Sequence, residues 1–170
     1  GTPRQCPDDR HADDPDHGAR HPPDRPGGGS SSIGLEYRLT ARVVANTSPV
    51  LSILVEEWAK YGNHPYTTFT ALVVDTRSGQ RWTTSAIVTA VQRSARPGVD
   101  LLTEIRRGVS PSSYDQSLIG FDDTELAPTR GGLHFAIDQC TIVCVAGPIE
   151  GTIAWSQLLA PGAPVPFAPW

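Results

Sequence analysis

Apolar and polar residues alternate along the chain from residue 33 onward, which is typical of β-strands with one buried side and one wet side. In the segment LEYRLTARVVA the apolar positions are Leu35, Tyr37, Leu39, Ala41 and Val43. The alternation repeats in VLSILVEEW through Leu51, Ile53 and Val55, and a third strand-like run, TTFTALVVD, follows a Gly-Asn-His-Pro corner. We expect three strands, and we expect the apolar side of the first two to face the core.

A turn and two helices are predicted next. The turn TRSGQ places Gly79 where a left-handed backbone conformation is needed. The first helix is expected to begin with Thr84 or Ser85 as its N-cap, and the second has Pro97 near its first turn and ends before Gly108. The inward-facing residues are expected to be Ile87, Val88 and Val91 in the first helix and Leu101, Leu102 and Ile105 in the second.

The last third of the chain returns to strand-like patterns. ELAPTRGGLHFAI predicts a hairpin with Leu133, Phe135 and Ile137 inward, EGTIAW predicts a final strand, and SQLL a short terminal helix. Strands, then helices, then strands are typical of an α+β fold. We therefore expect a mainly antiparallel sheet with two helices packed on one face.

Composition divides the chain into three parts. Residues 1–32 are rich in Pro, Gly, Asp, Arg and His and have almost no aliphatic residue, so we expect a disordered tail that buries too little apolar surface to offset its ordering entropy. Residues 33–160 are expected to form a single α+β domain. Residues 161–170 are expected to be a Pro-rich C-terminal tail.

Charge and hydropathy exclude two classes of function. The net charge of −4 and the pI near 5.7 argue against a nucleic-acid partner, which normally requires a basic patch. No apolar run approaches the ~18 residues of a membrane-spanning helix. The chain starts at Gly1 and contains no Met, so we expect a processed or trimmed form from which any signal peptide is already gone. The sequence gives no indication of the oligomeric state.

The order of several motifs resembles a known domain family. The succession runs from KYGNHPYTTFTALVVDTRSGQRWT through a helical segment to GGLHFAIDQCTIVCVAGPIEGTIAWSQL, and it covers roughly residues 50–160. It is similar to the extracellular domain of lysozyme-sensing anti-sigma factors of Gram-positive bacteria, and to a mycobacterial secreted immunogenic antigen of that family. The matching positions are His64 and Pro65, Asp75 to Gly79, Gly132 to Asp138, and the Ala146–Gly147 turn with the strand and helix after it.

This resemblance implies a β-grasp-like α+β fold and export to the cell surface or the medium, with no settled biochemical activity. We expect a binding role through contact with protein or envelope ligands. The resemblance implies an extracellular partner such as a lysozyme-like protein, while an esterase activity has been suggested for some relatives. Two departures limit the comparison: ANTSPV joins the first two strands directly, and Cys140 and Cys144 occupy a stretch that is often Pro- and Tyr-rich in relatives. No partner-binding residue is therefore transferred, and no cofactor or metal is expected.

The candidates for chemistry are His64 and His134, the histidines of the folded part. If their strands are neighbours, the two imidazoles and Asp138 or Asp75 converge as a base or a loose metal site of a weak secreted hydrolase. The alternative for His64 is structural: a residue before Pro65 favours extended backbone, and its ring nitrogens can bond backbone groups of the corner. We favour the structural role, and hence a binding domain over an enzyme.

The cysteines Cys140 and Cys144 present a second open choice. Residues four apart on a flat strand lie about 13 Å from each other, beyond the ~4.4–6.8 Å between the Cα atoms of a disulfide. A Cys140–Cys144 disulfide therefore requires the segment QCTIVCVAG to loop or bulge, and the alternative is two buried free thiols. We expect the disulfide, with the fate of Cys6 left open.

Overall fold

The computed structural model describes residues 35–47, 49–61, 64–109, 116–141 and 147–167, with the backbone alone described at His64. The N-terminal part of the described chain forms an antiparallel sheet with the strand order β1-β2-β3-β4, here called the first sheet. Its strands are β1 (Leu35–Thr47), β2 (Val50–Tyr61), β3 (His64–Asp75) and β4 (Arg81–Trp82). The strand β4 pairs with only two residues of β3, Val73 and Val74, so most of that edge of β3 lies beyond it.

A second antiparallel sheet, in the order β5-β6-β7, follows two helices. The elements are α1 (Thr84–Ser94), α2 (Leu101–Gly108), the short 3₁₀ helices η1 (Gln116–Leu118) and η2 (Phe121–Asp123), β5 (Thr124–Pro128), β6 (Gly132–Ile137), β7 (Ile149–Ala154) and α3 (Trp155–Leu158). The α+β class is confirmed, with the strands divided between two sheets.

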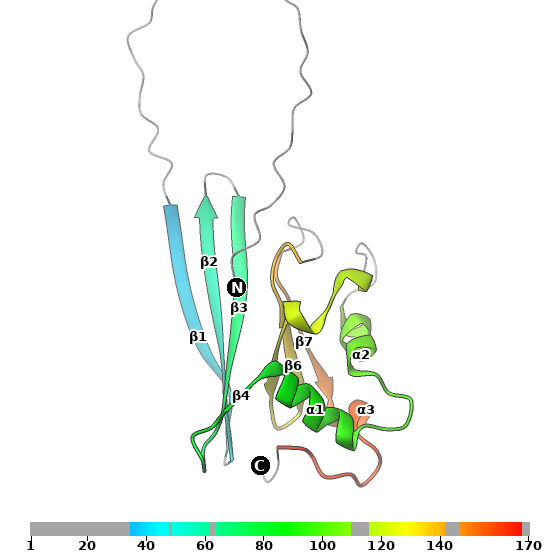
Figure 1. The fold of residues 1–170 in the computed structure, drawn as a ribbon. Helices are drawn as coiled ribbons and strands as arrows, with labels where there is room; N and C mark the ends of the chain where they lie inside the picture. Colours follow the sequence, from blue (N-terminus) through cyan, green and yellow to red (C-terminus); the bar gives the residue numbers. More distant parts are fainter. Residues whose placement is uncertain (1–34, 48, 62–63, 110–115, 142–146, 168–170) are drawn as a thin grey trace, which may run out of the picture.

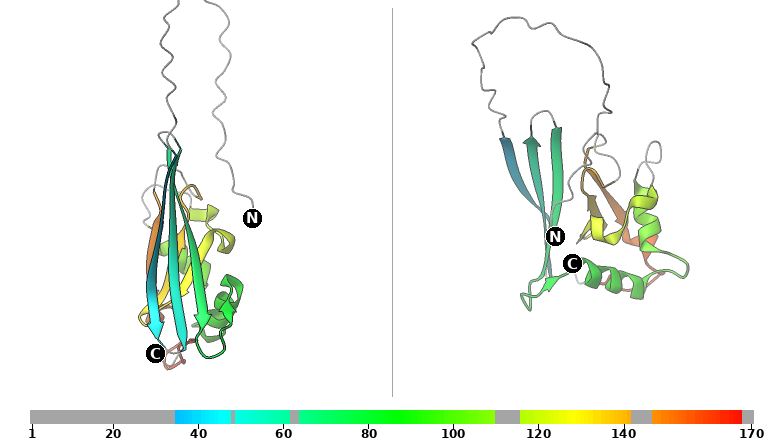
Figure 2. Two further views of the ribbon diagram at one scale, coloured as in Figure 1. Left: turned by 90° about the vertical axis from the view of Figure 1, so that its left-hand side faces the viewer. Right: turned by 45° about the horizontal axis from the view of Figure 1, so that its top comes forward.

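The second sheet lies between the first sheet and the helices (Figure 1). In the left panel of Figure 2 the first sheet stands in front of the second, which agrees with this order of layers. Leu133, Phe135 and Ile137 are buried as expected, and a side chain added at Gly108 of α2 would meet the Phe135 ring. The helices therefore cover the face of the second sheet that points away from the first.

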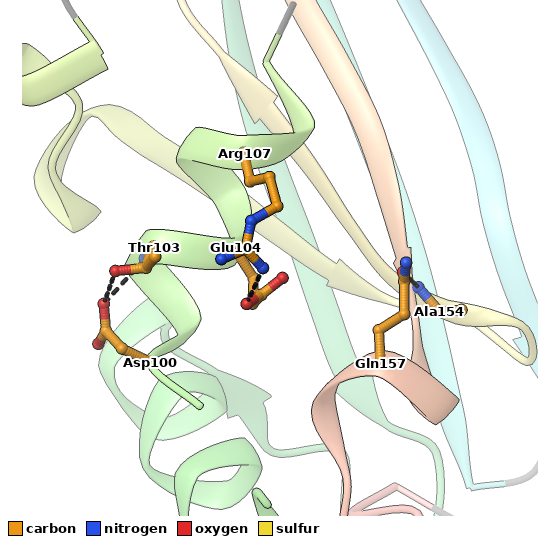
Figure 3. A network of polar contacts seen from close by, with 6 residues as sticks. All are labelled: Asp100, Thr103, Glu104, Arg107, Ala154 and Gln157. Atoms are coloured by element: carbon orange, nitrogen blue, oxygen red, sulfur yellow. Dashed lines mark hydrogen bonds and ion pairs between the residues drawn. The ribbon is translucent and has the colours of Figure 1, made fainter. Parts of the chain in front are cut away.

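Capping side chains explain where the helices begin. Thr83 accepts a hydrogen bond from Ala86 N at 3.2 Å, so the N-cap of α1 lies one residue before the expected Thr84. In α2 the N-cap is Asp100, which accepts from Thr103 N at 2.8 Å (Figure 3). Pro97 precedes this helix. The same view shows Gln157 Oε1 accepting from Ala154 N at 3.1 Å at the start of α3. Each acceptor satisfies a backbone N–H near a helix start.

The expected facing of β1 and β2 is wrong. The inward residues of β2 are Val50, Ser52 and Leu54, whereas Leu51, Ile53 and Val55 lie on the opposite side and are half-buried. From Leu35 to Val43, both the apolar and the polar residues of β1 are exposed. The second sheet packs against the even-numbered side of β2, where the Ser52 hydroxyl donates to the Pro128 carbonyl at 2.8 Å.

The folded domain continues past residue 160. Phe167 is 2% exposed and its ring packs edge-on against Trp82, with centroids 5.3 Å apart, and near Trp155 at 6.2 Å. Ala163 and Val165 pack against the same core. The expected boundary at residue 160 therefore lies too early in the chain, because the segment up to Phe167 supplies part of the core.

Candidate functional site

His134 sits within a chain of polar contacts on the side of β6 that faces the first sheet. Its Nδ1 lies 3.1 Å from Thr152 Oγ1, and its Nε2 lies 3.0 Å from Glu150 Oε2. Register explains both contacts, since Thr152 is directly opposite His134 and Glu150 is two residues away on β7. The Arg42 guanidinium of β1 forms an ion pair with the same Glu150 carboxylate.

The surroundings of this imidazole favour its neutral form. The side chain of His134 is 13% exposed, and its burial, followed by the Arg42 charge, lowers the pKa of His134. A neutral ring with its proton on Nε2 donates to Glu150 and accepts from the Thr152 hydroxyl at Nδ1. Hydroxyl, imidazole and carboxylate then stand in the order that proton transfer from Thr152 would use.

Asp138 and Glu125 make different contacts from His134. Asp138 Oδ1 accepts from Phe69 N at 2.6 Å, and Glu125 Oε2 accepts from Ala71 N at 2.9 Å, so both carboxylates satisfy the edge of β3. Burial, and to a smaller degree the neighbouring Glu125, raise the pKa of Asp138 to about 6. The structure thus places the Asp138 carboxylate at a strand edge.

The other residues singled out in the sequence have separate positions. The Asp75 carboxylate accepts from Arg77 N at 2.8 Å and Ser78 N at 3.1 Å, and Gly79 closes that turn at a φ of 72°. Gly147 has a φ of 75°. His64 is the first residue of β3, and its backbone lies opposite Tyr61 of β2. Pro65 follows it in the same strand and is exposed. The His64 side chain lies outside the described residues.

The cysteines keep their open status. Cys140 has a φ of 72°, in the left-handed region, three residues after the end of β6. Cys144 and Cys6 lie outside the described residues, so the Cys140–Cys144 pairing remains a prediction.

A second candidate site is the side of the first sheet that points away from the second sheet, here called the outer face. Cross-strand register aligns its residues in rows, for example Val43 with Ile53 and Leu72. The apolar and aromatic members of the outer face are Leu35, Tyr37, Leu39, Ala41 and Val43 of β1, Leu51, Ile53, Val55, Ala59 and Tyr61 of β2, and Tyr66, Leu72 and Val74 of β3.

This outer face is open to solvent along β1. Leu35, Tyr37, Leu39 and Val43 are 57–60% exposed. The only acidic residue of the described outer face is Glu57, which accepts a hydrogen bond from the Tyr37 hydroxyl, and desolvation followed by the Glu57 charge raises the pKa of Tyr37. Large exposed apolar patches of this kind mark interaction sites in soluble proteins.

A cavity of about 290 Å³ opens elsewhere, at the start of α1. Its lining includes Arg81, Trp82, Thr84, Ile87 and Glu125, and does not include His134 or its partners. Among the residues whose placement is described, no helix is long and apolar enough to cross a membrane, and no three His, Cys, Asp or Glu side chains group as metal ligands. The polar contacts of His134 thus lie apart from the lining of this cavity.

Sequence reasoning named His134 but missed its partners. Glu150 and Thr152 alternate in IEGTIA, which is enough to place them on one face of β7. The missing information was the β6–β7 register, which aligns that face with His134. Arg42 was not foreseeable, because it comes from the first sheet.

Comparison with known proteins adds little to this picture. No protein-family model matches the chain, and no curated protein matches it. A similar solved structure is the crystal structure of a member of the DUF3298 family from Bacteroides fragilis, with 13% identity and a TM-score of 0.40. The alignment covers 75% of this chain and 55% of that protein, so the chain spans about half of its length. This likeness is too low to assign a family or an activity.

Proposed function

We propose that this chain is a binding domain that acts by protein contact, at the cell surface or outside the cell. The observation that carries the proposal is the outer face, where apolar side chains from three adjacent strands are presented together. Burying apolar surface of this kind favours association through the hydrophobic effect. A face of this composition therefore favours a contact role.

The partner we propose is a basic extracellular protein of the lysozyme-like class. The formal net charge of −4 favours encounter with a basic protein, and Glu57 supplies a carboxylate within the outer face. The resemblance of the His64–Gly79 and Gly132–Asp138 motifs to lysozyme-sensing domains supports the same class.

Lysozyme binding to the immobilised chain tests this function. Val43→Glu, in the outer face, should weaken binding at least about tenfold, because a buried unpaired carboxylate costs more than the ~1.4 kcal/mol that corresponds to a factor of ten. The control is Leu118→Glu, since Leu118 is 54% exposed and lies on η1 away from the sheet. Equal affinities for both variants would overturn the role of the outer face, and no binding of lysozyme would overturn the partner.

The second candidate function is a weak secreted hydrolase at His134. It is favoured by the order Thr152 hydroxyl, His134 imidazole and Glu150 carboxylate, with hydrogen-bond distances of 3.1 and 3.0 Å. In this role His134 acts as the base for Thr152, and Glu150 orients the ring. The site expected from the sequence combined His64 with His134. The proposal here concerns His134 alone, because the His64 side chain lies outside the described residues.

Hydrolysis of a nitrophenyl ester separates the two functions. If the hydrolase is real, His134→Gln and Thr152→Val should abolish turnover while Thr152→Ser retains it, because serine keeps the hydroxyl. Turnover that does not respond to these variants, or no turnover above that of buffer, would overturn the hydrolase function. Binding would then be the one function proposed for this chain.

A further inference from the structure

We propose that β1 pairs antiparallel with the β1 strand of a second copy of this chain, which joins two first sheets into one continuous sheet. The inference goes beyond the proposed function, because it concerns the edge of the sheet and leaves the outer face open for a partner. It is carried by the free edge, the exposure of the apolar residues and the charge pattern of β1.

One long edge of the first sheet has no neighbour in the described part of the chain. β1 pairs with β2 on one side, and no described strand pairs with its other side (Figure 1). The regular part of this strand runs from Leu35 to Val43, and the bulge comes only between Val43 and Ala45. A long edge without proline or an early bulge is a template for pairing with another strand.

Exposure shows what a neighbouring strand would change. Ile53 and Leu72, which lie in the same cross-strand row as Val43, are half-buried, whereas Val43 is 58% exposed. The difference arises because β1 is flanked on one side only. A strand with apolar residues at matching positions would cover the open flank of Leu39 and Val43.

The charges of β1 select one register. Centring the pairing on Leu39 opposite Leu39 of the second copy places Glu36 opposite Arg42, and Leu35 opposite Val43. Opposite charges directly across an antiparallel pair are stabilising, and like charges are destabilising. Shifting the second strand by two residues in either direction places Arg38 opposite Arg38 or opposite Arg42 of the second copy. The charge pattern therefore fits a two-fold symmetric contact, the commonest type in soluble proteins.

The ion pairs already present leave room for this contact. Glu36 has Lys60 at 3.7 Å within the chain and a side chain that is 63% exposed, so its carboxylate can accept from a second cation. Arg42 is paired with Glu150, and its guanidinium has further donors. Residues 1–34 match the apolar positions of β1 poorly, since Ile33 is their single large aliphatic residue.

Disulfide trapping in a Cys6→Ser background tests the register. Leu39→Cys should form a covalent dimer on oxidation, because directly opposite residues have Cβ atoms about 4.5–5.5 Å apart, close to what a disulfide requires. Leu35→Cys and Val43→Cys should cross-link when mixed and not when oxidised separately. The control is Leu72→Cys, which lies on the outer face of β3 and should stay monomeric. Cross-linking of Leu72→Cys in place of Leu39→Cys would overturn edge pairing in favour of stacked outer faces.

Sedimentation of the full chain provides the independent measurement. The unmodified chain and Leu118→Lys should sediment as dimers, whereas Leu39→Lys, which places two ammonium groups together at the symmetry axis, should raise the dissociation constant at least about tenfold. Unchanged thermal unfolding of the separated Leu39→Lys monomer would show that the fold is intact. A full chain that remains monomeric would overturn the pairing and leave lysozyme binding as a separate question.

Discussion

The backbone N–H of Phe69 donates a hydrogen bond to the Asp138 carboxylate at 2.6 Å, across the gap between the two sheets. Two residues further along β3, Ala71 N donates to Glu125 at 2.9 Å, and Thr67 O accepts from Gln139 N at 2.9 Å. These groups lie on the edge of β3 beyond the two-residue strand β4. Groups from the second sheet therefore take the place of a neighbouring strand, which satisfies backbone groups that would otherwise be costly to bury.

Asp138→Asn should change the pH dependence of stability. The folded protein holds the pKa of Asp138 at about 6, above its ordinary value of 3.8, so the folded state binds the proton more tightly. The contribution of this group is present below pH 3.8 and is lost as the pH rises through 6. Relative to the parent, Asp138→Asn should gain about 1–2 kcal/mol between pH 4 and 7, a range reduced for solvent screening.

Urea unfolding at a series of pH values measures this difference. The asparagine amide oxygen can still accept from Phe69 N, so the variant keeps the hydrogen bond while losing the desolvated charge. A stability difference that does not vary with pH would contradict the raised pKa.

Glu125→Ala should destabilise the domain by about 1–3 kcal/mol, because Ala71 N loses its acceptor in a partly buried position. Glu125→Gln is the matched control, since its amide oxygen can accept the same bond. Chemical unfolding compares the two. Equal losses in both variants would mean that the carboxylate charge matters more than the hydrogen bond.

Gly151→Ala should cost about 1–3 kcal/mol, the usual cost of overpacking. A Cβ at Gly151 would lie 2.5 Å from the Phe135 ring, and Phe135 is fully buried between β7 and α2. Gly131→Ala is the control, because nothing lies within 4 Å of its added Cβ. Thermal unfolding should separate the two variants clearly, and matched melting temperatures would contradict the tight packing around Phe135.

Phe167→Ala should destabilise the domain by about 3–5 kcal/mol, as is typical of removing a buried aromatic ring. The ring packs against Trp82 and Trp155, so the tryptophan emission of the folded variant should also change. Val165→Ala, at a half-buried neighbouring position, should cost less. If Phe167→Ala lowers the free energy of unfolding no more than Val165→Ala does, residues 161–167 are not part of the stabilising core.

Local patterns were sufficient for the identity of most elements. The strands in LEYRLTARVVA, VLSILVEEW and GGLHFAID have a period of two, and α1 and α2 have apolar residues at helical spacing. The start of α1 was placed to within a residue, because a capping threonine is a local signal. The Gly79 turn is local as well, since its left-handed backbone requires a glycine or a similar residue.

The sequence by itself determined most of the segments that form strands and helices, and that β1 and β2 each have two distinct faces. Only the tertiary structure decided which face is buried, because Ile53 and Leu54 lie on opposite sides of β2 and the alternation allows either side to face the core. The second sheet packs on the side of Leu54. The tertiary structure also decided which polar groups meet. Arg42, His134 and Glu150 come from three strands of two sheets, and their contacts depend on registers that no local pattern contains.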